Sequence, residues 1–487
     1  MMLPEASIII PNFNNGRQSS LNGDRDLLDE LLRSLEITLG DDLDRVEIVI
    51  ADDGSTDDSL ATARRWAGRE GLGGRPFLRL IELEHGGILS TVLNRLMAET
   101  SAPIVFRFDG DIVLHSQGWL DRALRAFASN PRLGVLGGRQ LDHLGRVHSL
   151  GDLLYHPHGY QHIGAGLEKD VECEGFEPDH VMGCFHVMRR SAFDEVGPYD
   201  PAILRGQTID LGIALQVAGW TAWIEPQIVF SHHFALRAGR PTSADTSSGI
   251  ERSKAMFLSK WGFDRTCPDM QQMRARLGAS IVPGYQSLAQ DEAGIDEPDE
   301  VVLNRVELVR GALRPGVPTS IITIGTGDGR VEAELGEYGI SPTSLEDRPA
   351  AFEAFIGGAG LPPHLLEDLA RIPIESGTID LILLDRVLER NDSPIRVLEE
   401  CHRLLSENGV LLLLARSMTA LQQLQAPRRS DRFTPSGLRA FLSGSELFDS
   451  IGVSRRPLPC AEPGVLFYAL RRASAAGSMI GEPIECL

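Results

Sequence analysis

The sequence predicts an α/β protein with two parallel sheets, each covered by helices on both faces. Up to about residue 108, apolar runs of five to seven residues alternate with segments of helical periodicity, and the alternation returns after about residue 300. Strands that are apolar on both faces and separated by helices pair in parallel. A chain of 487 residues is long enough for two or three cores. We therefore expect two α/β domains.

The expected elements follow in order along the chain. In the first domain the strands are expected at 6–10, 46–51, 77–83 and 104–108, with helices at about 24–39, 57–68 and 88–99. In the second domain we expect a strand and glycine-rich turn at 320–330, a strand at 377–385, and a helix, turn and strand over 393–415. The acidic, turn-rich stretch between them predicts a division into 1–265, a linker at 266–299, and 300–487.

Composition excludes several classes of protein. The net charge of -21, from 47 basic and 68 acidic residues, argues against binding to nucleic acid. The six cysteines form no CxxC pair, which is typical of free thiols, although a disulfide between Cys173 and Cys184 stays open. No apolar run reaches the roughly 20 residues of a membrane-spanning helix. The opening "MMLPEASIIIPNF" does not read as a secretory signal, so we expect a cytoplasmic protein without a transmembrane segment.

Polar, turn-forming residues follow each of the first four expected strands. These segments are "PNFNN" (11–15), "DDGSTD" (52–57), "EHGG" (84–87) and "DGD" (109–111). Because ligands of parallel sheets bind at the carboxyl ends of the strands, the four segments predict one shared site. Asp109 and Asp111 would repel each other unless a cation or hydrogen-bond donors held them. A hard divalent metal is the simplest partner for two such carboxylates.

Residues 1–265 resemble the family 2 glycosyltransferases, which have the GT-A fold. "SIIIPNFNN" is similar to the family's opening strand and pyrimidine-binding turn, and "VIADDGSTDDS" to its acidic turn. "HGGILSTVLNRLMAETSAPIVFRFDGDI" resembles the region with its glycine, asparagine and DxD motif. "GRVHSLG", "VMGCFHVMRRSAFDEVGPYD", "IDLGIALQVAGW" and "KWGF" follow in the family's order.

The resemblance implies binding of a nucleotide diphosphate sugar and transfer of its sugar to a glycan or natural-product acceptor. It implies donor contacts from Pro11, Phe13, Asn14, Asp52, Asp53, Gly87, Asn94 and Asp109. It further implies Mn²⁺ or Mg²⁺ on Asp111, with Asp109 beside the ribose or the metal. His232 or His233 would complete the metal shell, because neutral imidazole binds divalent transition metals.

The position of the general base departs from the family pattern. The family's Glu-Asp pair aligns with Gln207 and Thr208, and threonine is no general base at neutral pH. Asp210 is the nearest carboxylate and our candidate for the base, although in the pattern it opens a helix. Another acid such as Asp179, or no base at all, stays open.

Histidines also gather at 143, 148, 156, 158 and 162. They lack acids at regular ligand spacing, so we interpret "HPHGYQH" as an acceptor-facing loop and not as a zinc site.

The second domain has its own glycine-rich turn. Gly325, Gly327 and Gly329 follow a strand, as in dinucleotide and S-adenosylmethionine sites. "LEDR" (345–348) and the stretch 372–414 resemble Rossmann-like class I methyltransferases. The resemblance implies that Glu346 binds ribose hydroxyls, that Glu367, Asp368 and Leu369 flank the adenine, and that Asp385 lies near the methionine end. Thr323 and Arg390 depart from the family's usual acid and histidine.

These expectations combine into one hypothesis and three alternatives. The hypothesis is metal-dependent glycosyl transfer followed by methylation of the product with S-adenosylmethionine. The alternatives are a glycosyltransferase with a non-catalytic scaffold domain, a non-catalytic sugar-nucleotide-binding protein, and a nicotinamide-dependent second domain.

Overall fold

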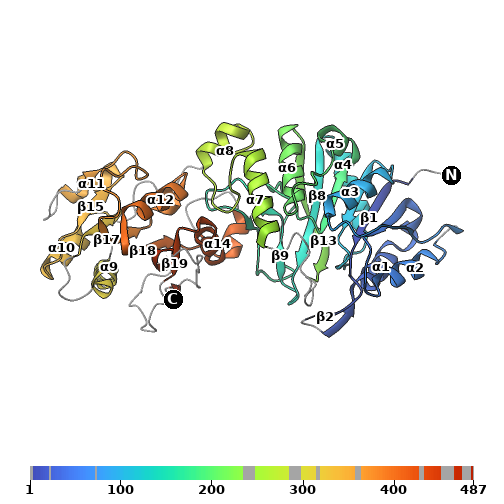
Figure 1. The fold of residues 1–487 in the computed structure, drawn as a ribbon, viewed down its shortest axis with the longest axis horizontal. Helices are drawn as coiled ribbons and strands as arrows, with labels where there is room; N and C mark the ends of the chain where they lie inside the picture. The colour runs from blue at the N-terminus through green and yellow to red at the C-terminus, as the bar shows by residue number, and fades with distance from the viewer. Residues whose placement is uncertain are drawn as a thin grey trace. The chain divides into compact units, whose positions relative to one another are not determined.

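The structure is a computed structural model that divides into two compact units (Figure 1). Unit 1 comprises Met1–Leu154 and His162–Gly262, and unit 2 comprises Tyr155–Gln161 and Phe263–Leu487. The described residues are 4–20, 23–71, 74–233, 247–283, 298–313, 319–356, 364–426, 433–450, 465–473 and 484–485. The predicted division into 1–265, 266–299 and 300–487 stays a prediction. The predicted linker contains helix α8 (Met270–Leu277), and its residues 284–297 lie outside the described part.

The four predicted strands of the first domain are confirmed and form one parallel half-sheet. β5 (Arg79–Glu82), β4 (Val46–Asp52), β1 (Ala6–Asn12) and β6 (Ile104–Phe108) lie side by side in that order. The sheet continues through β12 (Phe185–Arg189), β8 (Leu133–Leu141), β13 (Thr221–His232) and β7 (Ile112–Leu114) with mixed directions. All seven residues of β1 are buried, as expected for a strand covered on both faces.

The predicted helices of the first domain are α1 (Leu27–Leu39), α2 (Ser59–Ala67) and α3 (Leu89–Ala98). The first prediction began too early, because residues 24–26 belong to β3 (Gly23–Asp26), which pairs with β2 (Arg17–Ser20). The carboxylate of Asp26 accepts a hydrogen bond from the Asp29 N–H and thereby caps α1. Apolar residues of α1 pack with Ile8 and Ile10 of β1 in one core.

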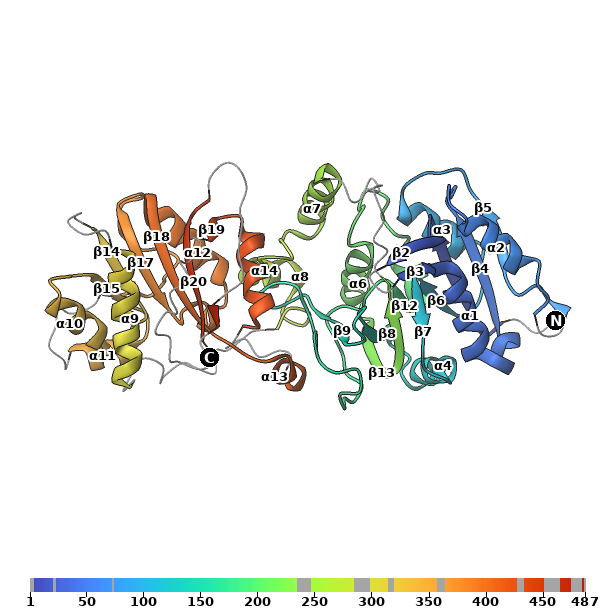
Figure 2. The same ribbon diagram turned by 90° about the horizontal axis from the view of Figure 1, so that it is seen from below.

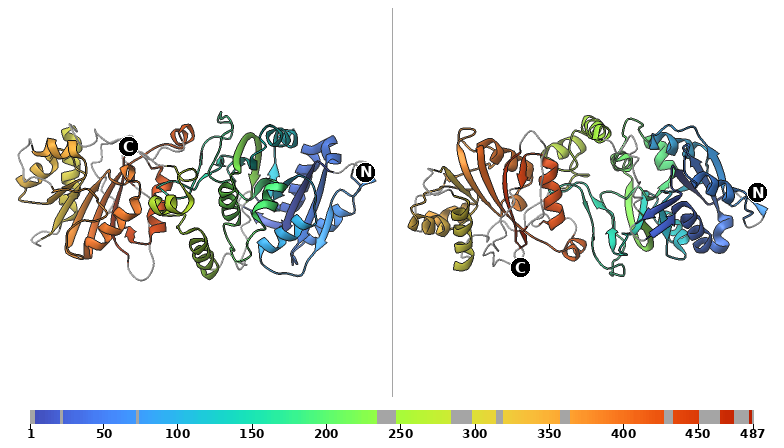
Figure 3. Two further views of the ribbon diagram at one scale, coloured as in Figure 1. Left: turned by 90° about the horizontal axis from the view of Figure 1, so that it is seen from above. Right: turned by 60° about the horizontal axis from the view of Figure 1, so that its bottom comes forward.

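Unit 1 contains further helices and strands besides these. They are the 3-10 helix η1 (Gly40–Arg45), α4 (Trp119–Ser129), β9 (Val147–Ser149), β10 (Asp152–Leu153), α5 (Arg190–Val196), α6 (Gln207–Val217) and α7 (Ser247–Trp261). β10 pairs with β11 (Gln161–His162) in a separate two-stranded sheet. Figure 3 shows helices on both sides of the strands of unit 1.

Unit 2 has a sheet with the order β16 (His364–Leu365), β15 (Thr343–Glu346), β14 (Ile321–Ile324), β17 (Ile379–Asp385), β18 (Leu405–Arg416), β20 (Val465–Arg472) and β19 (Phe448–Ser450). β16 to β18 pair in parallel, and β20 is antiparallel to β18 and β19. β21 (Ile484–Glu485) also pairs with β20. The helices are α9 (Asp299–Ala312), α10 (Arg330–Glu337), α11 (Pro349–Ile356), α12 (Pro394–Leu404), α13 (Ala420–Gln425), α14 (Pro435–Ser445) and the 3-10 helix η3 (Leu388–Arg390).

The sheet of unit 2 has a separate core on each face, as the sequence predicts. Ile322 and Ile382 pack with residues of α12, whereas Ile321 and Leu381 pack with residues of α9. Successive residues of a strand point to opposite faces, so α9 and α12 cover opposite sides (Figure 2). In the described part of the chain, no helix combines the length and apolar character needed to cross a membrane.

Candidate active site

The turn after β4 is held to the end of β1 by Asp52. The Asn12 Nδ2 donates to Asp52 Oδ2 over 2.6 Å, and the Ser55 hydroxyl donates to the same oxygen over 2.7 Å. The Ser55 N–H donates to Asp52 Oδ1 over 2.9 Å. Asp52 is therefore part of the frame of the site, because both of its oxygens already accept hydrogen bonds from neighbouring turns.

Asp53 joins the same turn to the segment after β5. Its Oδ1 accepts from the Gly86 N–H over 2.9 Å, and its Oδ2 accepts from the Gly87 N–H over 3.1 Å. The ring of His85 stacks on Phe13 with centroids 4.3 Å apart. The strand ends that carry Phe13, Asp53 and Gly87 thus come together, as predicted from their positions after β1, β4 and β5.

Two other predicted donor-binding residues differ in their surroundings. Asn14 has the left-handed φ of 56°, and its Oδ1 accepts the Thr56 N–H over 2.7 Å, so it lies in the assembled edge. Asn94 lies in α3, and its side-chain amide bonds to the main chain of Tyr199. Its Nδ2 donates to the Tyr199 carbonyl over 2.8 Å, and its Oδ1 accepts the Tyr199 N–H over 2.9 Å. Asn94 therefore fixes the segment after α5. Pro11 pairs in register with Ala51 within the sheet.

Asp109, Asp111 and His232 form a candidate metal centre. One ligand atom from each of them lies within 4.8 Å of the other two. The centre is built by strand pairing, because β13 runs antiparallel to β7 and sets His232 opposite Ile112. His232 Nε2 lies 3.1 Å from Asp111 Oδ1. Of the two predicted histidines, His232 joins the two carboxylates. His233 contacts Asp111 through the main chain, where its N–H donates to the Asp111 carbonyl.

Buried charge holds this centre in place. The Arg107 guanidinium is buried and donates to Asp109 Oδ1 over 3.0 Å. Burial lowers the pKa of His232, but Asp111 and Cys184 together outweigh it and raise that pKa well above its ordinary value. Two carboxylates and one imidazole are a donor set that suits Mn²⁺, so these residues fit a divalent metal ion.

The predicted base, Asp210, is already engaged by α7. Its Oδ2 accepts from the Lys260 ammonium over 2.9 Å and its Oδ1 from the Trp261 indole N–H over 2.7 Å. The alternative, Asp179, is buried, and its Oδ2 accepts the Leu154 N–H over 3.0 Å. Both carboxylates therefore accept hydrogen bonds from neighbouring residues in this arrangement. That Asp210 is the base stays a prediction.

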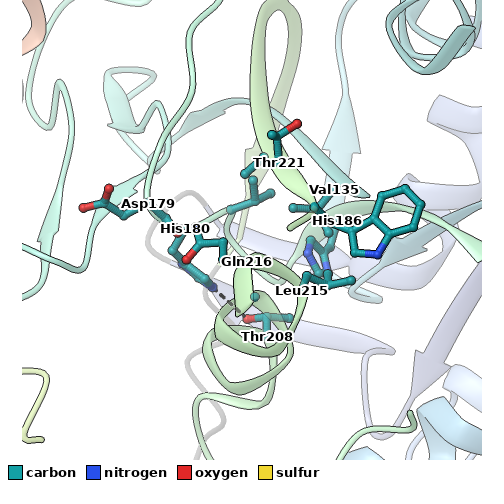
Figure 4. Close-up of a pocket in the computed structure, with 12 residues that line it drawn as sticks. Val135, Asp179, His180, His186, Thr208, Leu215, Gln216 and Thr221 are labelled. Carbon is teal, nitrogen blue, oxygen red and sulfur yellow. Dashed lines mark hydrogen bonds between the residues drawn. The ribbon is translucent and has the colours of Figure 1, made fainter. Parts of the chain in front are cut away.

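Sequence reasoning missed a buried polar cluster beside Thr208. Thr208 lines a cavity together with His180 and His186 (Figure 4). His180 in turn contacts Asp152, 28 residues earlier in the chain. No local motif connects these residues, and the predicted histidine cluster at 143–162 does not include His180 or His186. The predicted histidine cluster is divided, with His156 and His158 in unit 2 and His162 in unit 1.

In unit 2, the glycine-rich turn forms as predicted, but arginines occupy its surroundings. Gly325, Gly327 and Gly329 all have positive φ, which permits the tight turn. Arg348 donates to both oxygens of Glu346 over 2.8 Å, and its Nη2 also donates to the Gly325 carbonyl over 3.1 Å.

Other acidic residues at or near the predicted cofactor site of unit 2 form ion pairs or accept hydrogen bonds from nearby residues. Asp385 accepts from Arg305 and Arg386, and Asp347 pairs with Arg390. Asp368 is exposed and accepts the Ala370 N–H over 2.9 Å.

These contacts would compete with S-adenosylmethionine, the cofactor that the methyltransferase resemblance implies. Each oxygen of Glu346 accepts a hydrogen bond from the Arg348 guanidinium, which would compete with two ribose hydroxyls for the same carboxylate. Arg390 crowds the turn as well, because a Cβ added at Gly325 would lie 2.6 Å from its Nη2. The two arginines therefore contact Glu346, Asp347 and the turn at Gly325, residues that lie in or beside the predicted cofactor site.

A buried acid beside this turn gives the structure a pH-dependent stability. Glu389 Oε1 accepts the Arg416 N–H over 2.8 Å, while Oε2 has no hydrogen-bond partner among the described residues. Burial raises the pKa of Glu389 to about 7. Between the unfolded value, about 4.3, and pH 7 the folded chain holds a proton that the unfolded chain has lost, so stability falls as pH rises.

We expect Glu389→Gln to remove this pH dependence. The free energy of unfolding of the variant, relative to the wild type, should rise by about 3 kcal/mol between pH 4 and pH 8, because glutamine cannot ionise. Urea unfolding followed by circular dichroism at the two pH values measures this difference. A difference that does not change with pH would show that Glu389 ionises at its ordinary pKa.

The fold and the two family matches identify a transferase built from a GT-A-type α/β domain and a Rossmann-like α/β domain. Residues 7–197 match the model of glycosyl transferase family 2, and residues 322–413 match that of a methyltransferase domain. The chain is thus a fusion of a family 2 glycosyltransferase domain and a methyltransferase-like domain, and both resemblances are confirmed. No curated protein sequence matches it.

Two solved structures align with part of the chain. One is the crystal structure of GalNAc-T7 with UDP, GalNAc and Mn²⁺, at 14% identity and a TM-score of 0.39, covering 56% of this chain and 54% of that one. The other is TarS of S. aureus, at 14% identity and a TM-score of 0.36, covering 52% of this chain and 40% of that one. The alignment thus spans about half or less of these proteins.

Proposed function

We propose that the chain transfers a sugar from a nucleotide diphosphate sugar to a hydroxyl group of a glycan or natural product, with Mn²⁺ or Mg²⁺ held by Asp109, Asp111 and His232. The observation that carries the proposal is the meeting of these three ligand atoms within 4.8 Å in a unit that matches glycosyl transferase family 2. When bound, the metal neutralises negative charge on the departing diphosphate.

The protein's own residues would orient the donor around this centre. Arg107 fixes the carboxylate of Asp109 by a buried, charge-assisted hydrogen bond. Asp53 holds the glycine segment, and the stacked rings of Phe13 and His85 offer an aromatic face at the same strand ends. We infer that the nucleotide base contacts this aromatic face, because flat rings gain most from stacking on rings.

Release of the nucleoside diphosphate tests the proposal. The wild-type chain is incubated with a panel of nucleotide diphosphate sugars, with and without Mn²⁺, and with water or simple glycosides as acceptors. We expect metal-dependent release from donors of one nucleotide. If no donor is turned over and none raises the melting temperature, the proposed function is wrong.

The second unit has two candidate roles. The resemblance favours methylation of the glycosylated product with S-adenosylmethionine. The pairing of Glu346 with Arg348 favours instead a domain that acts as a scaffold, because the ribose-binding carboxylate is neutralised within the chain. We propose the scaffold role and derive no methyl-transfer step.

We expect the wild-type chain to show no change of melting temperature with S-adenosylmethionine at up to millimolar concentration. Arg348→Gln frees Glu346, so this variant should gain a ligand-dependent shift, and a ligand at about 100 times its Kd adds roughly 2.7 kcal/mol. Arg371→Gln, at an exposed arginine of the same unit, is the control and should behave like the wild type. Binding to the wild type would restore product methylation as the better proposal.

A further inference from the structure

A chain of hydrogen bonds leads from Thr208 into the interior of unit 1. The Thr208 hydroxyl lies 3.2 Å from His180 Nε2, the contact drawn in Figure 4. The other ring nitrogen, His180 Nδ1, lies 2.7 Å from Asp152 Oδ2. Asp152 Oδ1 lies 2.7 Å from His162 Nδ1. A hydroxyl, an imidazole and a carboxylate therefore follow one another in the order that general-base catalysis uses.

The direction of these hydrogen bonds follows from burial and charge. Asp152 is 0% exposed and His180 4% exposed. Burial would raise the pKa of Asp152, but His162 and His180 outweigh it and lower that pKa, so the group is a carboxylate that only accepts hydrogen bonds. His180 Nδ1 must then carry the proton. In the neutral ring Nε2 is left as an acceptor, to which the Thr208 hydroxyl donates.

Thr208 also lies near Arg107, the residue that contacts Asp109 of the candidate metal centre. A Cβ added at Gly183 would lie 3.1 Å from the Thr208 Oγ1 and 3.0 Å from the Arg107 Nη1, so both groups border the same point. The other amino group of Arg107 holds Asp109. The main chain agrees with this placement, because the Asp109 N–H donates to the carbonyl of Cys184, the residue after Gly183.

We propose that Thr208 and His180 take the proton of the acceptor hydroxyl, in place of the aspartate that the family carries at position 208. This inference rests on the proposed glycosyl transfer. The acceptor oxygen bonds to the anomeric carbon of the sugar while the bond from that carbon to the diphosphate breaks, and its electron pair leaves with the diphosphate. The acceptor proton passes to Thr208 Oγ1 as the Thr208 proton passes to His180 Nε2. Asp152 is a positioning residue that stabilises the resulting imidazolium.

The test combines removal of the histidine with return of a carboxylate. His180→Gln should lower kcat for nucleoside diphosphate release by about 10²- to 10⁴-fold, the usual contribution of a general base, and should leave stabilisation by donor and Mn²⁺ unchanged. Adding Thr208→Asp to His180→Gln should raise kcat at least tenfold above that of His180→Gln alone, because a carboxylate at position 208 accepts the proton directly.

His186→Gln is the matched control. His186 is a buried histidine that lines the same cavity. It is not one of the residues of the hydrogen-bond chain described above. We expect its turnover to stay near that of the wild type. Wild-type turnover in His180→Gln would overturn the proposal. A double variant no faster than His180→Gln would assign His180 a structural role and would overturn it too.

A measurement without substrate separates this inference from the proposed function. In protein with ¹⁵N-labelled histidine, we expect a far-downfield Nδ1 proton from His180 that is lost in His180→Gln and in Asp152→Asn and kept in His186→Gln. Absence of this resonance in the wild type overturns the proton path even if the chain transfers sugar. A wild-type chain that shows the resonance but neither turns over any donor nor is stabilised by one contradicts the proposed function, and with it the catalytic role of the pair.

Discussion

Asp111→Ala will abolish metal-dependent turnover of the nucleotide diphosphate sugar. Asp111 is one of only two carboxylates in the described ligand cluster, and its Oδ1 also holds His232 at 3.1 Å. A metal at a leaving diphosphate contributes several kcal/mol to the transition state, and each 1.36 kcal/mol is a factor of ten. We therefore expect kcat/KM to fall at least 100-fold. Release of nucleoside diphosphate across a Mn²⁺ titration measures the loss.

Asp142→Asn provides the matched control. Asp142 is an aspartate of the same unit whose Oδ1 accepts the N–H groups of Leu144 and Arg146 in the loop between β8 and β9. Its substitution should leave the Mn²⁺ dependence of turnover unchanged. If Asp111→Ala keeps the wild-type response to Mn²⁺, the cluster of Asp109, Asp111 and His232 is not the metal centre.

The parallel half-sheet and the strand-end site could be predicted because both depend on local sequence. An apolar run that ends in a turn fixes where its strand ends, and parallel pairing then brings the ends together. The meeting of Asp53 with Gly87 and of Asp111 with His232 follows from this rule together with the resemblance.

The partners of individual side chains could not be predicted in the same way. The expected contact of Asp52 with the ligand stays a prediction, and its hydrogen bonds to Asn12, 40 residues away, and to Ser55 were not foreseen. Arg348 follows Glu346 by two residues, and nothing in the spacing says that its guanidinium folds back onto that carboxylate. The partner of a long, flexible side chain depends on the burial and charge of its surroundings, and these exist only in the folded chain.

The side-chain partners of Thr208, at the position of the family's base, could not be predicted from the sequence either. Thr208 marks the missing aspartate in the sequence, but its nearest polar partner, His180, precedes it by 28 residues, and Asp152 precedes His180 by another 28. Thr208 lies in α6 and Asp152 in β10, and the loops between these elements bring both to His180. Loop paths are the part of a fold that periodicity describes least. A substitution at a motif position is therefore best interpreted together with the side chains that the fold places around it.

Arg305→Met should give the largest loss of stability in unit 2. Arg305 and Asp385 are each 1% exposed, and the Arg305 Nε donates to Asp385 Oδ2 over 3.1 Å. Breaking one side of a buried ion pair typically costs about 3–5 kcal/mol, because it leaves a buried charge uncompensated. Burial would raise the pKa of Asp385, but Arg305 and Arg386 outweigh it and lower that pKa. The loss is therefore full at neutral pH and shrinks as pH falls below about 4.

The distribution of tryptophan makes this loss measurable within one chain. All five tryptophans lie in unit 1, so their fluorescence follows that unit alone, whereas circular dichroism follows both units. Urea unfolding of Arg305→Met should therefore shift part of the circular dichroism transition and leave the fluorescence transition in place. Arg310→Met is the control, since this exposed arginine of the same helix pairs with Glu307, and such surface pairs are worth about 0–1 kcal/mol. A loss below about 1 kcal/mol in Arg305→Met would mean that Arg386 alone compensates the charge of Asp385.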